Sequence, residues 1–472
     1  MNIKGIIYFL SLFCFPVSIL SFINILYASY FDYFLNVESY TFTLIISFLV
    51  GSGLYFFGKK SQKKINFYEQ LILIFFTYLL ISFLISIPYY FSNYQITFIN
   101  AIFESFSGVT STGFSIFENI KYLDPTLILW RSSSQWIGGF YFLIFLILLF
   151  SNKQFNYKLN HIVYSGDSNI NNENNIKKNI LQIFLIYSFL TVLIFIFLSS
   201  VEIRLFNALN LSMTLISNGG FLPTNSLNQI VKSNSQEFIL IISLLLSMIN
   251  IFFLFNIFNK KNFLQEHHED LGLIILSILF ILILFIFVDN LNLSEIIINI
   301  LSSLSNSGLT ISTIPGNITL YFFFLTMIGG SLISNSSGIK FIRFYILLKT
   351  SSAEILRLVR PNNITNQNIL YSDNKIDLEN IKNSFFIFIS FFLSLFILSG
   401  ILIFDVFNFE NSFKISILTL TNTTASELFG IKNISFANLL TSSKISLIIF
   451  MIVGKIELIS FFLIIKKFLI KT

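Results

Sequence analysis

Residues 100–114, NAIFESFSGVTSTGF, decide the fold of this chain, because a short apolar stretch there ends in small and hydroxyl residues. Similar endings occur at residues 217–221, SNGGF, at 305–309, SNSGL, and at 422–426, NTTAS. The apolar stretches before them, such as 100–109 and 206–216, are too short to cross a bilayer core of about 30 Å. They suit half-helices that dip into a membrane and return as extended chain. We therefore expect four internal repeats of one helix, loop, helix plan.

The composition is typical of a polytopic membrane protein. Of the 472 residues, 55% are apolar and only 11% are charged, far from the balance of a soluble domain. A single cysteine, Cys14, excludes a disulfide framework and a cysteine-based metal site. The three histidines fall in polar connecting segments, and we expect the adjacent His267 and His268 to lie in a solvated loop.

A transmembrane helix needs about 20 apolar residues, and ten segments qualify as spans. They lie near residues 5–29, 41–58, 67–90, 127–150, 180–200, 238–259, 271–289, 318–348, 384–405 and 442–465. The first is longer than a signal-peptide core and is interpreted as a retained span. The expected units are an N-terminal two-helix unit at 1–64, repeats at 65–160, 175–262, 266–350 and 384–472, and a cytoplasmic linker at 351–383.

The distribution of charge predicts the orientation. When both termini are placed in the cytoplasm, most of the 29 Lys and Arg residues fall on the cytoplasmic side, as basic residues do in membrane proteins. All four loop endings then lie outside, where acidic residues predominate. A negative outer face concentrates cations, and a positive inner face suits anionic lipid headgroups in the bilayer. Nucleic-acid binding is therefore a poor explanation of the basicity.

Four loops of irregular backbone predict an ion pathway. Hydrocarbon cannot pair free carbonyl groups, so such loops survive in a bilayer only when they are buried in protein or line water. A ring of backbone carbonyls can replace the hydration shell of a monovalent cation, and glycine allows the backbone angles that this requires. The preceding half-helices would point their negative ends at the same place. Each cluster alone could be an ordinary turn, but repetition at one point of the plan favours a pore.

Several motifs resemble those of the TrkH/KtrB family of bacterial potassium transporters, closest to the TrkH branch. Residues 103–113, FESFSGVTSTG, match the first pore helix and filter of that family, and residues 130–139, WRSSSQWIGG, match the start of its next helix. Residues 329–340, GGSLISNSSGIK, resemble the stretch that breaks the long helix after the third filter. Residues 354–361, EILRLVRP, and 454–457, GKIE, resemble a cytoplasmic motif and the last helix.

The resemblance implies an all-α integral membrane protein with two extra N-terminal helices and four pseudo-symmetric helix, pore loop, helix repeats around one ion pathway. It implies potassium as the transported ion, bound at a selectivity filter made of Thr110, Ser111, Thr112, Gly113, Ser217, Asn218, Gly219, Gly220, Ser305, Asn306, Ser307, Gly308, Asn422, Thr423, Thr424 and Ala425. It implies an intramembrane gate made of Gly329, Gly330, Ser331, Ser337, Gly338, Lys340 and Lys455.

The resemblance also implies partners and a location. Family members are usually homodimers in the bacterial cytoplasmic membrane and work with a TrkA-like cytosolic nucleotide-binding protein. No nucleotide-binding loop is recognisable in this chain, and no bound organic cofactor is expected. Lys455 occupies the position of a family arginine that projects toward the pore, and Glu457 lies close to it.

Five alternatives stay open at this point. Ala425 stands where a fourth filter glycine is expected, so a sodium or mixed sodium/potassium permease of the same fold competes with a potassium permease. A polytopic membrane enzyme would need clustered acids, a histidine or an activated nucleophile, and the chain offers no recurring set, so we expect no enzyme. A structural protein would not need four similar loops. The run 329–338 could be a glycine-mediated packing surface, and Lys455 with Glu457 a packing pair.

Overall fold

The computed structural model describes residues 2–61, 65–150, 173–259, 267–288, 292–312, 316–360, 368, 376–405, 408–431 and 434–456. Every element of regular secondary structure in these ranges is helical. This confirms the all-α fold that the sequence predicts.

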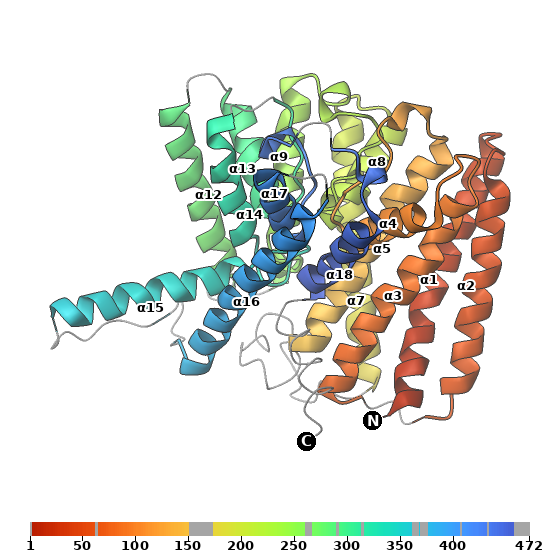
Figure 1. Cartoon of the computed structure of the whole chain (residues 1–472), viewed down its shortest axis with the longest axis horizontal. Coiled ribbons are helices and arrows are strands. Elements are labelled where there is room, and N and C mark those ends of the chain that lie inside the picture. The colour runs from red at the N-terminus through yellow and green to blue at the C-terminus, as the bar shows by residue number, and fades with distance from the viewer. Residues whose placement is uncertain are drawn as a thin grey trace.

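Seven long helices match expected spans and are apolar enough to cross a membrane. They are α1 (Ile3–Tyr30), α2 (Val37–Gly58), α3 (Phe67–Tyr90), α5 (Pro125–Phe150), α7 (Glu173–Ser200), α12 (His268–Phe287) and α16 (Leu378–Ile403). They run roughly side by side, with α1 and α2 together at one edge of the bundle (Figure 1). Local signals define their ends: α3 begins at a capping box in which the Glu69 carboxylate accepts the Asn66 backbone N–H at 2.8 Å.

Two of the other three expected spans are not single continuous helices. The span expected at 238–259 is divided into α9 (Asn234–Met248) and α10 (Phe253–Asn259). The span expected at 318–348 is divided into α14 (Thr319–Ile328), a loop, and α15 (Phe341–Val359), which projects crosswise from the bundle (Figure 1). The last, α18 (Thr441–Ile456), is described only as far as Ile456.

Glycine explains the break after α14. Gly329 and Gly338 have φ angles of +70° and +78°, which residues with a Cβ adopt only at a cost. The backbone N–H and C=O groups of the serine-rich chain between them cannot form helical hydrogen bonds. They bond instead to side chains and to neighbouring segments. Apolar length alone predicted a span here, and the resemblance of residues 329–340 to a helix-breaking stretch of the TrkH family implied the break that the structure has.

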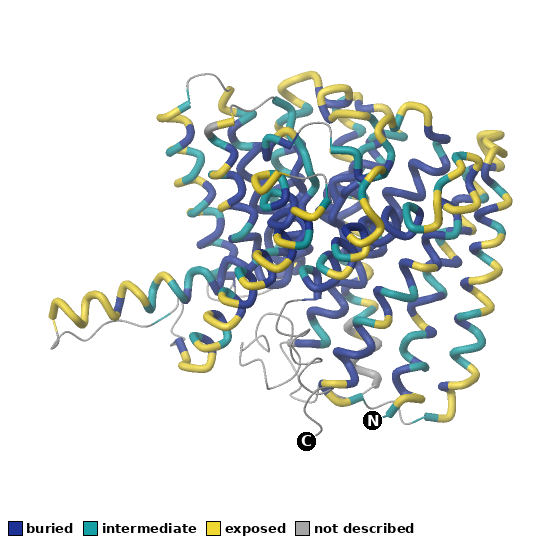
Figure 2. Tube along the Cα trace, viewed as in Figure 1, coloured by how far each residue is buried: buried dark blue, intermediate teal, exposed yellow. Residues whose placement is uncertain are grey.

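Four short helices lie inside the bundle. They are α4 (Phe98–Val109), α8 (Leu205–Ser217), α13 (Leu293–Ser305) and α17 (Phe409–Leu420), and each precedes one of the four loops found in the sequence. Each of the four helices becomes fully buried toward its C-terminal end, and the centre of the molecule is buried throughout (Figure 2). Close approach is possible because α5 carries Gly138, where a Cβ would lie only 2.9 Å from Val109 Cα at the end of α4.

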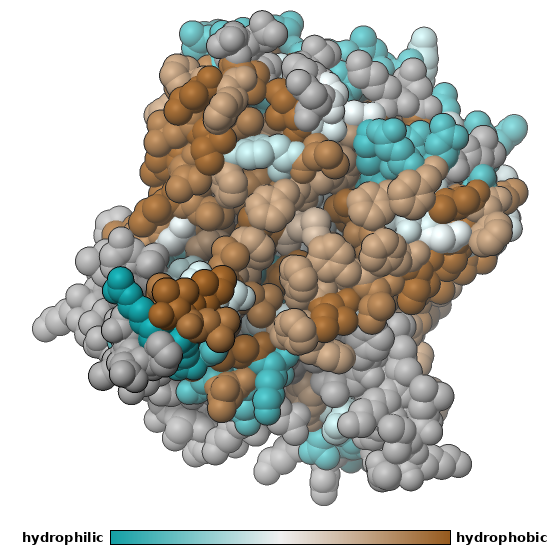
Figure 3. Space-filling view, turned by 60° about the vertical axis from the view of Figure 1, so that its left-hand side comes forward, coloured by the Kyte–Doolittle hydropathy of each residue, from teal (hydrophilic) through white to brown (hydrophobic). Residues whose placement is uncertain are grey.

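The outer face of the bundle is apolar. Figure 3 shows hydrophobic side chains gathered over much of one face, with hydrophilic groups toward its margins. On α12 the exposed side chains include Ile275, Ile278, Leu282, Phe285 and Ile286. Exposing an apolar patch of this size to water would cost free energy, whereas contact with lipid would not.

Candidate functional site

Each short helix ends in the same way. The residue after the helix, or the next one, takes a left-handed conformation: Ser111, Asn218, Asn306 and Asn422 have φ angles of 57°, 55°, 65° and 46°. The following backbone N–H then donates back into the last turn of the helix. These bonds are Thr112 N to Ser107 O at 2.9 Å, Gly219 N to Thr214 O at 3.0 Å, Ser307 N to Ser302 O at 3.0 Å, and Thr423 N to Leu418 O at 2.9 Å. One local motif, a Schellman-type helix end, therefore occurs four times.

This shared geometry fixes the correspondence between the loops. Two residues after the left-handed position come Gly113, Gly220 and Gly308, with φ angles of +77°, +73° and +67°. In the fourth loop the same count leads to Thr424, which does not have a positive φ. The sequence comparison that put Ala425 at the glycine position is therefore one residue out of register, because the hydrogen bonds, which define the register, are not visible in the sequence.

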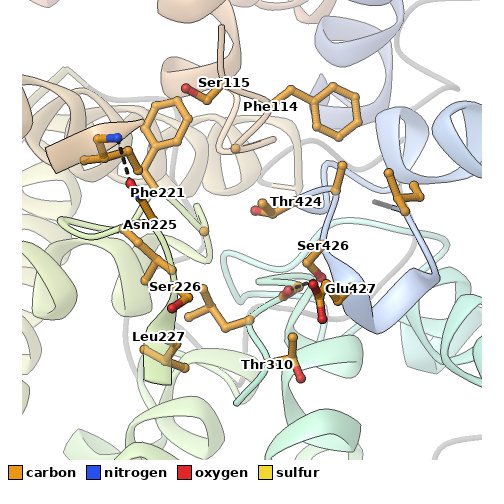
Figure 4. Close-up of a pocket in the computed structure, with 18 of the residues that line it drawn as sticks. Phe114, Ser115, Phe221, Asn225, Ser226, Leu227, Thr310, Thr424, Ser426 and Glu427 are labelled. Atoms are coloured by element: carbon orange, nitrogen blue, oxygen red, sulfur yellow. Dashed lines mark hydrogen bonds between the residues drawn. The ribbon is translucent and has the colours of Figure 1, made fainter. Parts of the chain in front are cut away.

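The four loops meet at one point. A Cβ built on Gly113 or Gly220 would collide with Thr424 Oγ1, and one built on Gly308 would lie 2.7 Å from Thr424 O. The Thr424 hydroxyl donates to Gly219 O at 3.4 Å, and the Ser426 hydroxyl donates to Gly308 O at 2.7 Å. The close-up shows Thr424 between the loops, at the centre of the group (Figure 4).

A cavity of about 810 Å³ lies against the ends of these loops. Its lining includes Gly113, Gly220 and Gly308, one from each of the first three loops. The close-up labels Thr424, from the fourth loop, in the same lining (Figure 4). The cavity is large enough for a hydrated ion, and Glu118 and Glu427 in its wall carry negative charge. Carboxylates beside such a cavity raise the local concentration of cations.

A buried ion pair holds the first loop. Arg131 Nε lies 2.9 Å from Glu104 Oε1, with side-chain exposures of 1% and 0%. The other carboxylate oxygen accepts the Ile116 backbone N–H at 2.8 Å, and the guanidinium lies 4.2 Å from the centre of the Phe221 ring. Because an ion pair is expensive to desolvate, this one serves mainly to fix geometry. It joins the first and second loops.

Side-chain amides hold the other loops. Gln135 Nε2 donates to Gly219 O at 2.5 Å, and its Oε1 accepts the Phe221 N–H at 3.2 Å. The three left-handed asparagines each donate to a carbonyl of the next helix in their own repeat. These bonds are Asn218 to Ser247 O at 3.2 Å, Asn306 to Thr326 O at 2.8 Å, and Asn422 to Met451 O at 2.9 Å. The loops are thus braced on all sides, as a rigid ion-binding site requires.

Comparison with known proteins identifies the family. A family model described as TrkH, cation transport protein, matches residues 37–309, which is more than half of the chain. The chain belongs to the TrkH family. It is accordingly a transport protein and not an enzyme, as the sequence predicted.

Individual TrkH relatives agree with this assignment. The chain is 25% identical to an uncharacterized cation transporter of Methanocaldococcus jannaschii, over 83% of this chain and 86% of the relative. It is 23% identical to the Trk system potassium uptake protein TrkH of Escherichia coli, over 69% of this chain and 71% of the relative. Its fold is similar to the crystal structure of the potassium transporter TrkH from Vibrio parahaemolyticus, with a TM-score of 0.82, 19% identity and 98% of both chains covered.

The loop between α14 and α15, residues 329–340, contacts residues of the other three expected repeats. Toward repeat 2, the Ser331 N–H donates to Met248 O at 3.0 Å and Asn335 Nδ2 donates to Ile216 O at 2.6 Å. Toward repeat 4, Asn335 O accepts from Lys455 Nζ at 3.1 Å. Toward repeat 1, Lys340 Nζ lies 5.6 Å from the centre of the Phe142 ring. A segment that contacts all its neighbours in this way crosses the middle of the bundle.

The 329–340 loop lies on the side of the four loops away from the cavity. It contacts the beginnings of the second and third loops, since Asn335 Nδ2 donates to Ile216 O at 2.6 Å and the Ser337 N–H donates to Asn306 Oδ1 at 3.1 Å, whereas the cavity is lined by the loop ends. Within the loop, Lys340 Nζ donates to the carbonyls of Ser331, Ser334 and Ser336 at 3.1, 3.2 and 2.5 Å. Both Lys340 and Lys455 are 1% exposed.

Acidic residues at the start of α12 hold the 329–340 loop and the neighbouring break between α9 and α10. Glu269 Oε1 accepts the Leu332 N–H at 2.8 Å, and Asp270 Oδ1 accepts the Asn250 N–H at 2.8 Å in the break between α9 and α10. His267 Nδ1 lies 2.7 Å from Asp270 Oδ2, and the His267 residue is 1% exposed. The expectation of a solvated His267 is therefore wrong: tertiary packing buries it against a carboxylate.

The structure brings together all four sets of residues that the sequence singled out as a filter. The expected gate residues lie together next to these loops, on the side away from the cavity. Sequence reasoning missed the special place of Thr424, and it missed the anchoring by Glu269 and Asp270. Two acids at the N-terminus of an expected helix were a weak signal for the latter. Glu457 lies outside the described residues, so the expected pairing with Lys455 is not part of the described structure.

Proposed function

We propose that this chain mediates potassium uptake across the cytoplasmic membrane, through a filter formed by the loops 110–113, 217–220, 305–308 and, in the register set by the backbone hydrogen bonds, 421–424. The observation that carries the proposal is the convergence of four equivalent helix ends on one point beside a cavity. Carbonyl oxygens arranged around such a point can replace the hydration shell of potassium. Relatives described as potassium uptake proteins, such as TrkH of Escherichia coli, support the choice of ion.

Growth of a bacterium that lacks its own potassium uptake systems tests this function. Cells expressing the chain should grow at limiting potassium, and cells expressing Gly113→Ser or Gly308→Ser should not. Serine fails at both positions because a Cβ is strained at positive φ and crowds the fourth loop. The matched control is Gly53→Ser, in α2, where a Cβ would meet nothing within 4 Å. Growth of all three variants at equal membrane abundance would contradict the filter assignment.

A sodium or mixed sodium/potassium permease is a second candidate because of Thr424. A hydroxyl at the glycine position narrows the meeting point of the loops and offers a ligand on a flexible side chain. Uptake measured with potassium and with sodium as the only monovalent metal cation distinguishes the two.

The 329–340 loop is proposed as the gate. It crosses the bundle next to the filter and brings two buried ammonium groups, of Lys340 and Lys455, into the expected path of a cation. Two positive charges there oppose the passage of a third, so conduction requires the loop to move. Substituting Lys455 by Met should raise cation flux if this loop closes the pathway.

The remaining proposals rest on family resemblance. They are a homodimer, a cytosolic TrkA-like nucleotide-binding regulator, a bacterial cytoplasmic membrane with both termini in the cytoplasm, and the repeat boundaries given above. Relatives that belong to Trk systems support the regulator. Co-purification of the chain with such a regulator, in a nucleotide-dependent manner, tests that partner.

A further inference from the structure

The two gate lysines share an aromatic neighbour on α5. Lys455 Nζ lies 4.4 Å and Lys340 Nζ 5.6 Å from the centre of the Phe142 ring. Phe142 is 3% exposed and belongs to repeat 1, whereas the lysines come from repeats 4 and 3. No family motif that we matched in the sequence includes Phe142, and its position on an apolar helix gave no sign of a role.

The shared ring offsets part of the electrostatic cost of burying two ammonium groups close together. Two buried ammonium groups next to one ring repel each other, and a low-dielectric interior makes that repulsion strong. The 329–340 loop relieves Lys340 with three carbonyls. In the described part of the chain, Lys455 has the Asn335 carbonyl at 3.1 Å and the Ser337 hydroxyl at 3.5 Å. The face of an aromatic ring carries partial negative charge and attracts a desolvated cation, so the ring supplies what the loop does not.

We propose that Phe142 is a positioning residue of the gate, and that its ring holds Lys340 and Lys455 so that the 329–340 loop stays across the pathway. This inference rests on the proposed gate. The Phe142 ring is a contact through which α5 reaches both lysines. A weaker ring should release the loop and raise the flux of cations.

Graded fluorination of Phe142 tests the ring without changing its shape. One, two or three fluorine atoms withdraw charge stepwise from the ring face, whereas the side chain stays apolar and close to its original size. In proteoliposomes that contain the full-length chain, rubidium or potassium flux should rise at each step, by about tenfold over the series, which corresponds to about 1.4 kcal/mol. Phe142→Trp should keep flux at or below the parent level, because tryptophan binds cations best.

Phe145 provides the matched control. It is 2% exposed on the same helix, and it packs against Phe13 and Tyr78 with ring-centre distances of 5.3 and 5.5 Å. Fluorination of Phe145 should leave flux unchanged. In a Lys455→Met background, fluorination of Phe142 should change flux much less than in the parent. Equal rises in flux for fluorinated Phe142 and fluorinated Phe145 would overturn the proposal, and a flat flux response at Phe142 is decided by the position of the loop itself.

A second measurement separates this inference from the proposed function. The only native cysteine, Cys14, is buried and can be replaced by serine, and Ser334→Cys then reports on the 329–340 loop, since Ser334 is 1% exposed. A water-soluble thiol reagent should label this cysteine faster as Phe142 is fluorinated. Faster labelling with unchanged flux would retain the role of Phe142 in holding the loop and refute the loop as gate. Unchanged labelling would refute the role of Phe142.

Discussion

Replacing Thr424 by Gly should make the chain more selective for potassium over sodium. In the structure Thr424 holds the position of Gly113, Gly220 and Gly308, and its hydroxyl stands between the loops. The variant removes that hydroxyl and makes the fourth loop equivalent to the other three. The partly exposed side chain makes one long bond, to Gly219 O at 3.4 Å, so we expect a stability loss of only about 1 kcal/mol, mostly from glycine entropy.

The size of the selectivity change follows from the same contact. A hydroxyl ligand contributes about 1 kcal/mol net, and the smaller ion benefits more from it because it tolerates a narrower site. If sodium loses about 1 kcal/mol of binding free energy relative to potassium, the ratio of potassium to sodium uptake rises about fivefold. The ratio is measured from initial uptake rates into proteoliposomes. Each ion is supplied separately, and the membrane potential is the same in both measurements.

Ala425→Gly is the decisive control. If the register read from the backbone hydrogen bonds is correct, Ala425 lies one residue past the glycine position, and its replacement should leave the ratio within about twofold. A large change for Ala425→Gly together with none for Thr424→Gly would refute the register and restore the equivalence suggested by the sequence.

Three further predictions follow. Gly220→Ala should abolish uptake, because its Cβ meets Thr424 Oγ1 and Ser307 O at positive φ, and adding Thr424→Gly should restore part of the uptake in the double variant. Glu104→Gln should lower the free energy of unfolding by about 3–5 kcal/mol, because it leaves the buried Arg131 charge unpaired. The control is Glu354→Gln, which should change that free energy by less than about 0.5 kcal/mol because the ion pair of Glu354 with Arg357 is exposed. Thermal unfolding in detergent distinguishes the two variants. Asp270→Ala should cost about 1–3 kcal/mol and speed labelling of Ser334→Cys, because the buried Asn250 N–H loses its acceptor; unchanged labelling would show that this anchor does not reach the loop.

The sequence predicted the helical class, most of the spans and the four loop endings, because these are local properties. Apolar length reports on membrane helices, and glycine, asparagine and serine report on backbone turns, wherever the rest of the chain lies. The break at residues 329–340 was implied by the family resemblance, and the positive φ angles of Gly329 and Gly338 give its local cause. Local reasoning was less successful with 238–259, where the helix ends after Met248 although neither glycine nor proline marks the end. At this helix end the backbone forms hydrogen bonds with the 329–340 loop, through Met248 O and Ile251 N.

Only the tertiary structure decided which residues act together. The equivalence of Thr424 with the three glycines depends on hydrogen bonds to the preceding turn, and an error of one residue is invisible in a sequence of similar hydroxyl residues. The burial of His267 depends on how separate segments pack. So does the placement of Phe142 next to Lys340 and Lys455, which are more than 100 positions apart in the sequence. Physical proximity between distant segments carries no local signature, so composition and periodicity determine the elements, and packing determines the site.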